Sequence, residues 1–76
     1  MCLADIKPGQ KMLVEEFSAD LSIKRRLQDL GMIKGTVVEC IGISPLGDPS
    51  AYFIRKTVIA IRKEDAEQIW GVEVAE

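Results

Sequence analysis

The stretch 28-QDLGMIKGTVVEC-40 decides the fold, because Gly31 and Gly35 stand between a helical pattern and a strand-like run. Glycine adopts positive φ without steric cost and often ends a helix. A membrane Gly-xxx-Gly pairing motif would need a long apolar segment, but Asp29 and Lys34 interrupt this one. A phosphate loop would need a strand before the glycines and Gly-Lys-Ser/Thr before a helix, and that order is absent here. We therefore interpret both glycines as the boundary between a helix and a strand.

The residues before this boundary predict a strand followed by a short helix. Gly9 completes a Pro-Gly turn signal, and the run 11–17 after it places Met12 and Val14 on one side of a strand. Within 22–30, apolar residues recur at i, i+4 and i+7, which forms one stripe of a helix. Three polar side chains precede that stripe as candidate N-caps: Ser18, Asp20 and Ser22.

The residues after the boundary predict further strands. The run 36–43 is rich in β-branched residues, and Gly42 within it indicates a bulge. A loop at 44–49 separates this run from strands at 50–55 and 57–62, which we expect to form a hairpin. Because neither glycine nor asparagine stands at the turn, the sequence gives poor support to a two-residue primed turn.

The C-terminal part predicts a short helix and a last strand. Acidic residues open the helix at 63–69, as the helix dipole favours. In 70–76, Trp70, Val72 and Val74 alternate with small or polar residues. Five short strands in so small a chain are best buried, and best protected at their edges, in a strongly bent barrel. We therefore predict a mainly β fold with short helices after the first strand and before the last.

Length and charge predict one domain over 1–76 and argue against a nucleic-acid binder. A chain of this size buries about 60% of its unfolded surface. The net charge is −2 and the pI about 5.1, whereas phosphate binding relies on clustered basic residues. The longest apolar run, 58–61, is far shorter than the roughly 20 residues that span a bilayer, and no signal peptide is visible. We expect a cytoplasmic protein that does not insert into the membrane.

The residue types needed for catalysis are missing, so we expect no enzyme. The chain contains no histidine, and without one none of its serines looks like an activated nucleophile. The acidic pairs 15–16 and 64–65 are typical of a solvated face and a helix start. We expect Cys40 to pack as a small apolar residue in a strand and Cys2 to be an exposed thiol, with no disulfide between them. We expect no resident cofactor, although weak surface binding of iron or zinc through carboxylates and Cys2 stays an open alternative.

Three segments, 26–40, 45–49 and 57–74, together resemble the ferrous iron transport protein A (FeoA) family. The matching residues keep the family's order and spacing over nearly the whole chain: Arg26, Leu27, Leu30, Gly31, Met32, Gly35, Pro45, Gly47, Asp48, Pro49, Ile61, Arg62, Asp65 and Ala66. One departure lies at 55–56, where the family often has a glycine and this chain has Arg-Lys.

The resemblance implies an SH3-like barrel and a small cytosolic accessory of bacterial ferrous iron uptake. The implied partner is a FeoB-type permease, a membrane protein with a cytosolic GTP-binding domain, at which this chain would sit peripherally on the inner membrane. Whether it would activate GTP hydrolysis, gate the pore or aid assembly stays open. A small-barrel nucleic-acid-binding protein and a direct transition-metal-binding protein are the alternatives.

We expect the docking surface to be the groove between the helix 22–30 and the barrel. The basic run 24–26 is either a solvated helix face or a site for an acidic partner. The expected partner-binding residues are Arg25, Arg26, Met32, Leu46 and Asp48, and the expected turn residues are Gly9, Gly31, Gly35, Pro45, Gly47 and Pro49.

Overall fold

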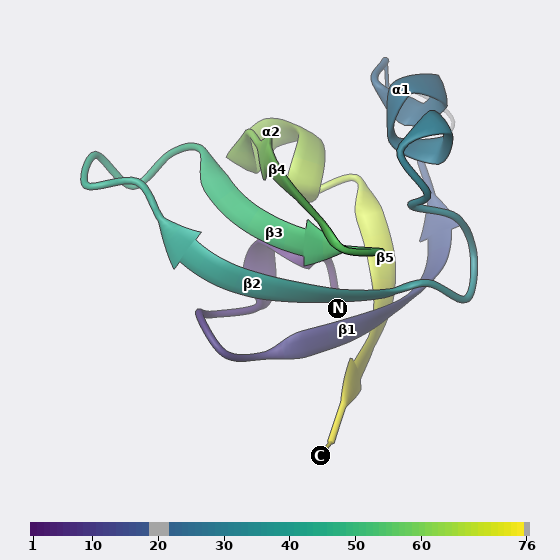
Figure 1. Ribbon diagram of the computed structural model, residues 1–76, viewed down its shortest axis with the longest axis horizontal. Helices are drawn as coiled ribbons and strands as arrows, with labels where there is room; N and C mark the ends of the chain where they lie inside the picture. Colours follow the sequence, from purple (N-terminus) through teal and green to yellow (C-terminus); the bar gives the residue numbers. More distant parts are fainter. Residues whose placement is uncertain (19–21, 76) are drawn as a thin grey trace.

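Strands dominate the computed structural model, which describes residues 1–18 and 22–75. Its elements, labelled in Figure 1, are η1 (Leu3–Asp5), β1 (Lys11–Phe17), α1 (Lys24–Asp29), β2 (Val37–Ile43), β3 (Ser50–Ile54), β4 (Thr57–Ile61), α2 (Lys63–Ala66) and β5 (Ile69–Val74). The predicted order of strand, helix, strand, hairpin, short helix and strand is confirmed. Several elements are one to three residues shorter than expected, and β5 begins one residue earlier, at Ile69, which was predicted to end the second helix.

The five strands form one antiparallel sheet in the order β4-β3-β2-β1-β5. β1 pairs with β2 on one side and with β5 on the other. β5 runs steeply across the direction of β2 in Figure 1, so the sheet is strongly twisted. The β2–β3 register shifts between Cys40 and Gly42, which confirms the bulge predicted at Gly42.

The concave side of the sheet holds the core. Met12 and Val14 of β1 are fully buried, as their alternation predicted, and Leu27 brings the stripe of α1 into the same cluster. The other members come from every strand and both ends of the chain: Leu3, Ile6, Met32, Val38, Cys40, Tyr52, Ile54, Ile59, Ile61, Ala66 and Ile69. Within the described residues, these side chains form one hydrophobic cluster.

The buried side chain of Thr36 stabilises the loop between helix α1 and strand β2, which contains Gly31 and Gly35. Gly31 and Gly35 have φ of +101° and +91°, as expected of residues that end a helix and start a strand. The Thr36 hydroxyl donates to the Gly31 carbonyl at 3.0 Å and accepts from the Ile33 amide at 3.2 Å. Thr36 is 6% exposed, and it precedes β2 rather than opening it as predicted. The hydroxyl therefore ties the two glycines into one tight loop.

Helix α1 begins later than its expected caps. Ile23 occupies the N-cap position and makes no side-chain capping bond. Ser18 follows directly on β1 and Ser22 lies in a turn, while Asp20 falls outside the described residues. The N-cap prediction was therefore wrong for both serines, because the apolar stripe that packs on the core, rather than a polar cap, sets where this helix begins.

The β3–β4 turn corrects the sequence expectation. Ile54 pairs directly with Thr57, so the loop has two residues, Arg55 and Lys56. Their φ values are +41° and +68°, both in the left-handed region that defines a primed hairpin turn. The turn therefore forms without glycine or asparagine, because the continuous pairing of β3 with β4 from Ser50–Ile61 to Ile54–Thr57 leaves a loop of this length and twist.

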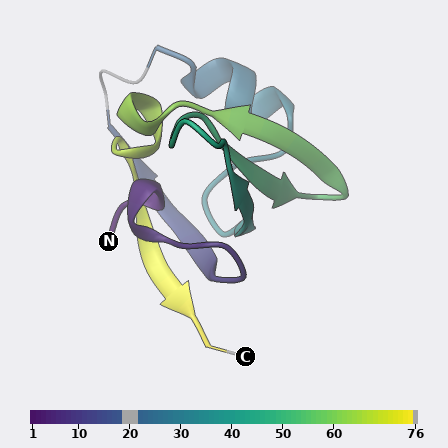
Figure 2. The same ribbon diagram turned by 90° about the vertical axis from the view of Figure 1, so that its left-hand side faces the viewer.

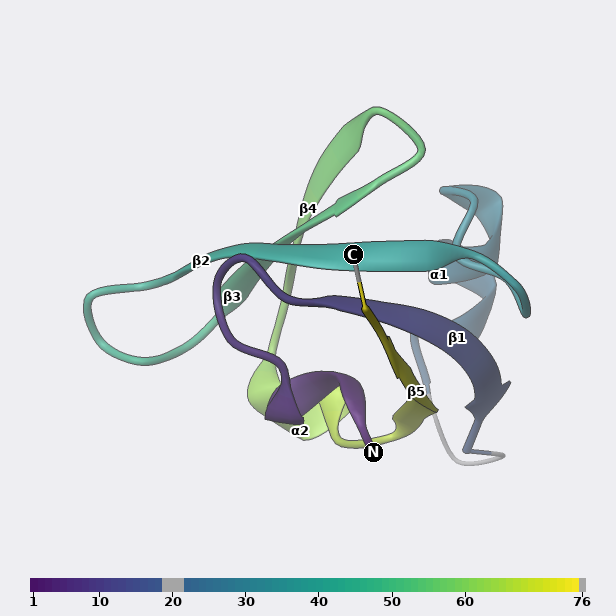
Figure 3. The same ribbon diagram turned by 90° about the horizontal axis from the view of Figure 1, so that it is seen from below.

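The N-terminus pairs with the last strand, which buries Cys2. The Gly71 amide donates to the Met1 carbonyl at 2.9 Å, the terminal ammonium donates to the Gly71 carbonyl at 3.0 Å, and Cys2 forms a bridge with Trp70. Cys2 is 8% exposed, so the expectation of an exposed thiol was wrong. Behind this bridge, η1 lies beside α2 (Figures 2 and 3).

Candidate functional site

A groove lies between helix α1 and the end of strand β4, where the sequence predicted a docking surface. Its volume is about 320 Å³. The lining comes from α1, the 44–49 loop, β4 and the start of α2: Ile23, Arg26, Pro49, Ala60, Ile61, Arg62 and Asp65. We call it the α1–β4 groove. Figure 2 shows α1 alongside β4 at this end of the molecule.

Two guanidinium groups give the α1–β4 groove its charge. Arg26 and Arg62 are both exposed, and Asp65 is the one acidic residue in the lining. Among residues 1–18 and 22–75, no salt bridge engages either arginine. The floor between them is apolar, with Ile23, Ala60 and Ile61. An apolar floor with free arginines at its rim suits a protein ligand that carries carboxylates.

Of the predicted partner-binding residues, the structure brings only Arg26 into this lining. Arg25 is exposed on the same helix but does not line the groove. Met32 is fully buried in the core, so its expected place at the border of the groove was wrong. The chain turns back toward the sheet at Gly31, and this turn directs the next side chain into the barrel instead of outward.

The 44–49 loop contributes one wall residue and one exposed tip. Pro49, which follows a cis peptide bond, lines the groove. Leu46 is 93% exposed at the loop tip and lies outside the groove lining. The carboxylate of Asp48 accepts a 2.8 Å bond from the Lys63 amide. Asp48 therefore fixes the loop to the start of α2, and this is its visible structural role.

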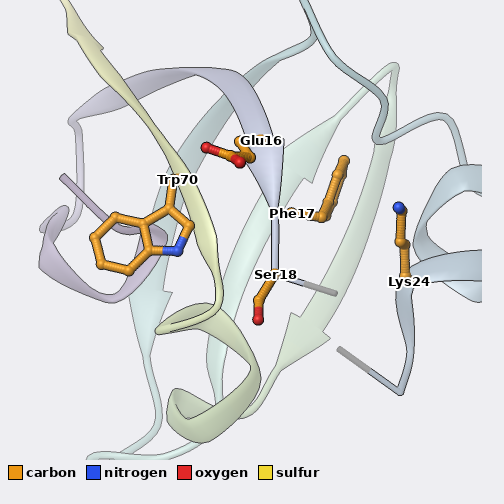
Figure 4. Close-up of a pocket in the computed structure, with 5 residues that line it drawn as sticks. All are labelled: Glu16, Phe17, Ser18, Lys24 and Trp70. Carbon is orange, nitrogen blue, oxygen red and sulfur yellow. The ribbon is translucent and has the colours of Figure 1, made fainter. Parts of the chain in front are cut away.

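A second pocket lies between the end of β1, the start of α1 and the start of β5. It measures about 390 Å³ and is lined by Glu16, Phe17, Ser18, Lys24 and Trp70 (Figure 4). The Lys24 ammonium lies 5.9 Å from the centre of the Phe17 ring, within cation–π range. Trp70 is 46% exposed. The sequence analysis did not single out this pocket, although a lone tryptophan on the outer face of a strand is a usable signal of a contact surface.

The described residues contain no cluster of metal-ligating side chains. Among residues 1–18 and 22–75, no three histidine, cysteine or acidic side chains are close enough to hold a metal ion. Burial raises the pKa of the Cys2 and Cys40 thiols. No helix in the described part of the chain is long and apolar enough to cross a membrane.

Comparison with known families decides what kind of domain carries this groove. A model of the FeoA domain matches residues 1–73. The chain belongs to the FeoA family. The resemblance seen in the sequence is thus confirmed, and the family places the chain among small accessory domains of ferrous iron transport. No curated protein sequence matches the chain.

Solved FeoA structures share this fold. The FeoA protein from Chlorobium tepidum is 31% identical, with a TM-score of 0.91 over 99% of this chain and 71% of that one. A FeoA-like protein from Clostridium acetobutylicum is 26% identical, with a TM-score of 0.88 over 100% and 88%. FeoA from Stenotrophomonas maltophilia, crystallised with zinc, is 28% identical, with a TM-score of 0.81 over 95% and 89%. That protein is described as an SH3 domain proposed to act as a ferrous iron transport activating factor. The predicted SH3-like, mainly β fold is therefore confirmed.

Proposed function

We propose that this FeoA domain docks through the α1–β4 groove on the cytosolic part of a FeoB-type permease and regulates ferrous iron uptake. The observation that carries the proposal is the pair Arg26 and Arg62, which form no salt bridge within residues 1–18 and 22–75, above an apolar floor in a domain of this family. Partly buried apolar contact with arginine at its rim is typical of protein-binding hot spots. The domain would act in the cytoplasm and reach the inner membrane through this partner.

Other functions have less support from the described residues. A nucleic-acid-binding barrel needs a basic surface and stacked aromatics, whereas this chain has a net charge of −2 and four aromatic residues. For catalysis, the chain has no histidine to serve as the general base of a serine or cysteine nucleophile. A direct iron carrier would need an accessible ligand set, and both thiols are buried. We therefore propose a protein-binding role without a resident cofactor.

Co-purification tests the proposed docking. The tagged domain is expected to retain the FeoB-type permease from detergent-solubilised membranes. Arg26→Glu should reduce the retained permease at least about tenfold, because it reverses one of the two free charges in the groove. Arg25→Glu is the matched control: it makes the same charge change one residue away, outside the lining. Equal losses in both variants would refute the groove as the docking site, and a domain that never retains the permease would refute the partner.

A further inference from the structure

The outward face of the sheet carries more apolar side chains than a free sheet face usually does. Trp70 and Val72 of β5 are 46% and 47% exposed, whereas Gly71 between them is buried. The apolar alternation that predicted this strand therefore faces away from the core. An antiparallel sheet with one free face normally turns polar residues to that face.

Cross-strand neighbours join these side chains into two rows. The shorter row runs over β2, β1 and β5: Val37, Leu13 and Val72. The longer row runs over all five strands from β4 to β5: Val58, Phe53, Glu39, Lys11 and Val74. We call the residues of both rows the outer-face patch, and none of them lines the α1–β4 groove. A contiguous apolar patch of this kind marks an interaction site.

The longer row is complementary to itself under a two-fold axis. From β5 to β3 it reads Val74, Lys11, Glu39 and Phe53. Consider a second copy stacked face to face, with the axis parallel to the strands and midway between the neighbours β1 and β2 (Figure 1). The rotation reverses the strand order over the first copy, so Lys11 lies over Glu39 of the second copy and Val74 over its Phe53. An isologous dimer makes each contact twice, so both ammonium groups meet a carboxylate and both valines meet an aromatic ring.

The size of the patch fits a weak dimer. The five strands have five to seven residues each, so together they cover an area of roughly 24 by 20 Å at the ordinary strand spacing and rise. Two such faces would bury about 1,000 Å² in total, which is the lower end of the range for specific interfaces. Valine side chains on two pleated faces interdigitate at the usual separation of about 10 Å between packed sheets.

We infer that the domain forms an isologous dimer through the outer-face patch, with Lys11 and Glu39 of the two copies paired crosswise at its centre. A second copy supplies the charges in the reversed order that this row requires. A lipid surface fits less well, because the Glu39 carboxylate in the middle of the row repels anionic headgroups. The inference does not depend on the proposed docking function, since the patch and the α1–β4 groove share no residue.

Sedimentation equilibrium of the full chain tests whether the dimer forms. We expect the average mass to rise from that of one copy, 8.4 kDa, toward twice that value as the concentration increases. A small interface of this kind should give a dissociation constant of the order of 100 µM, so the concentration series extends to about 1 mM. A mass that stays at one copy throughout the series would overturn the inference.

Two charge-reversal variants test which residues meet. Lys11→Glu and Glu39→Lys each place like charges over one another in a dimer, so each variant alone should dimerise at least about tenfold more weakly. An equimolar mixture of the two should regain dimerisation, because every carboxylate of one variant then meets an ammonium group of the other. A purely structural effect within one chain would not be rescued by mixing. A mixture that stays monomeric would therefore overturn the inference.

Val74→Lys and Val58→Lys compare the two ends of the longer row. Val74 lies over Phe53 of the second copy, whereas Val58, on the last strand of the sheet, lies beyond β5 of the second copy. Val74→Lys should therefore weaken dimerisation at least about tenfold, and Val58→Lys should leave it unchanged. Equal losses in both variants would overturn this arrangement of the two copies. So would binding of the monomer to phosphatidylserine vesicles that Val74→Lys abolishes.

NMR on a mixture of isotope-labelled and unlabelled protein gives a direct readout. We expect nuclear Overhauser effects between the Val74 methyl groups and the Phe53 ring, observed only between copies. Within one chain β5 and β3 are three strand spacings apart, about 14 Å, which is too far for such an effect. A dimer without this contact would show that another surface joins the two copies, and it would overturn the inference.

Discussion

The side chain of Arg55 lies over Gly31: a Cβ atom on Gly31 would stand 2.6 Å from Cδ of Arg55. This contact joins the end of helix α1 to the β3–β4 turn, two segments that are far apart in the sequence. Together with the groove at the other end of β4, it places α1 alongside this edge strand. The end of helix α1 and the β3–β4 turn are therefore in direct contact through one residue pair.

Gly31→Ala should lower the free energy of unfolding by about 1–3 kcal/mol, because alanine is strained at φ +101° and its methyl displaces Arg55. Chemical denaturation measures the change. Gly35→Ala is the matched control, since it has a similar φ of +91° and open space around it. Adding Arg55→Ala should recover the excess cost of Gly31→Ala over this control. Equal losses of unfolding free energy in Gly31→Ala and Gly35→Ala would show that the Arg55 side chain moves aside without cost. Arg55 would then not couple the turn to the helix.

The local signals in the sequence predicted the element order well. Gly31 and Gly35 stop a helix and start a strand through their positive φ angles, and Gly42, whose φ is not in the left-handed region, marks the bulge in the β2–β3 pair. Such signals act within a few residues, so they can be recognised without the fold. The apolar alternation of Met12 and Val14 likewise predicted the buried side of β1.

The features that depend on long-range contacts could not be predicted in this way. Arg62 and Ala60 reach the groove only because α1 packs beside β4. Cys2 is buried through backbone pairing with β5, which any residue type can provide. Met32 suits a contact surface and a core equally well, and only the path of the chain after Gly31 places it inside. The sequence thus predicted the helical wall of the α1–β4 groove, while the opposite wall needed the structure.

Met32→Ala and Arg26→Ala should separate stability from docking. Met32 is fully buried, so its truncation should cost about 2–5 kcal/mol of unfolding free energy by creating a cavity. Because Arg26 is exposed, its truncation should lower the free energy of unfolding by less than about 0.5 kcal/mol. The same truncation should weaken permease retention. Thermal denaturation and co-purification on the same samples give both readouts. An Arg26→Ala variant that unfolds, or retains the permease fully, would contradict the assignment of this side chain to the docking surface.

Gly71→Ala should destabilise the domain by at least about 3 kcal/mol. A Cβ atom at Gly71 would clash with the backbone carbonyl oxygen of Leu13, its neighbour across the β1–β5 pair, and backbone cannot move aside as a side chain can. Gly42→Ala serves as the matched control, because it lies in the same sheet with nothing within 4 Å of the added methyl. Denaturant midpoints compare the two variants. A Gly71→Ala domain as stable as Gly42→Ala would show that β1 and β5 can separate at little cost.

The stability of the domain should fall as the pH rises into the alkaline range. Burial raises the pKa of Cys2 and Cys40 above the ordinary thiol value of 9.0, and burial raises the pKa of Tyr52 above the ordinary phenol value of 10.0. Each group favours the folded state while it is protonated. This stabilising contribution is complete at pH values below the pKa that the group has in the unfolded chain. It is lost as the pH rises through the higher pKa that the group has in the folded protein.

Denaturation of the reduced protein between pH 7 and about pH 10.5 measures this loss, with at most about 1.4 kcal/mol lost per pH unit for each group that titrates. Cys40→Ala should start less stable at pH 7 and show a shallower alkaline decline, because one titrating thiol has been removed. The pH slope separates this effect from the cavity that the substitution leaves, since a cavity lowers stability equally at every pH. A flat stability profile across this range, or an unchanged slope in Cys40→Ala, would show that the buried thiol does not couple folding to pH.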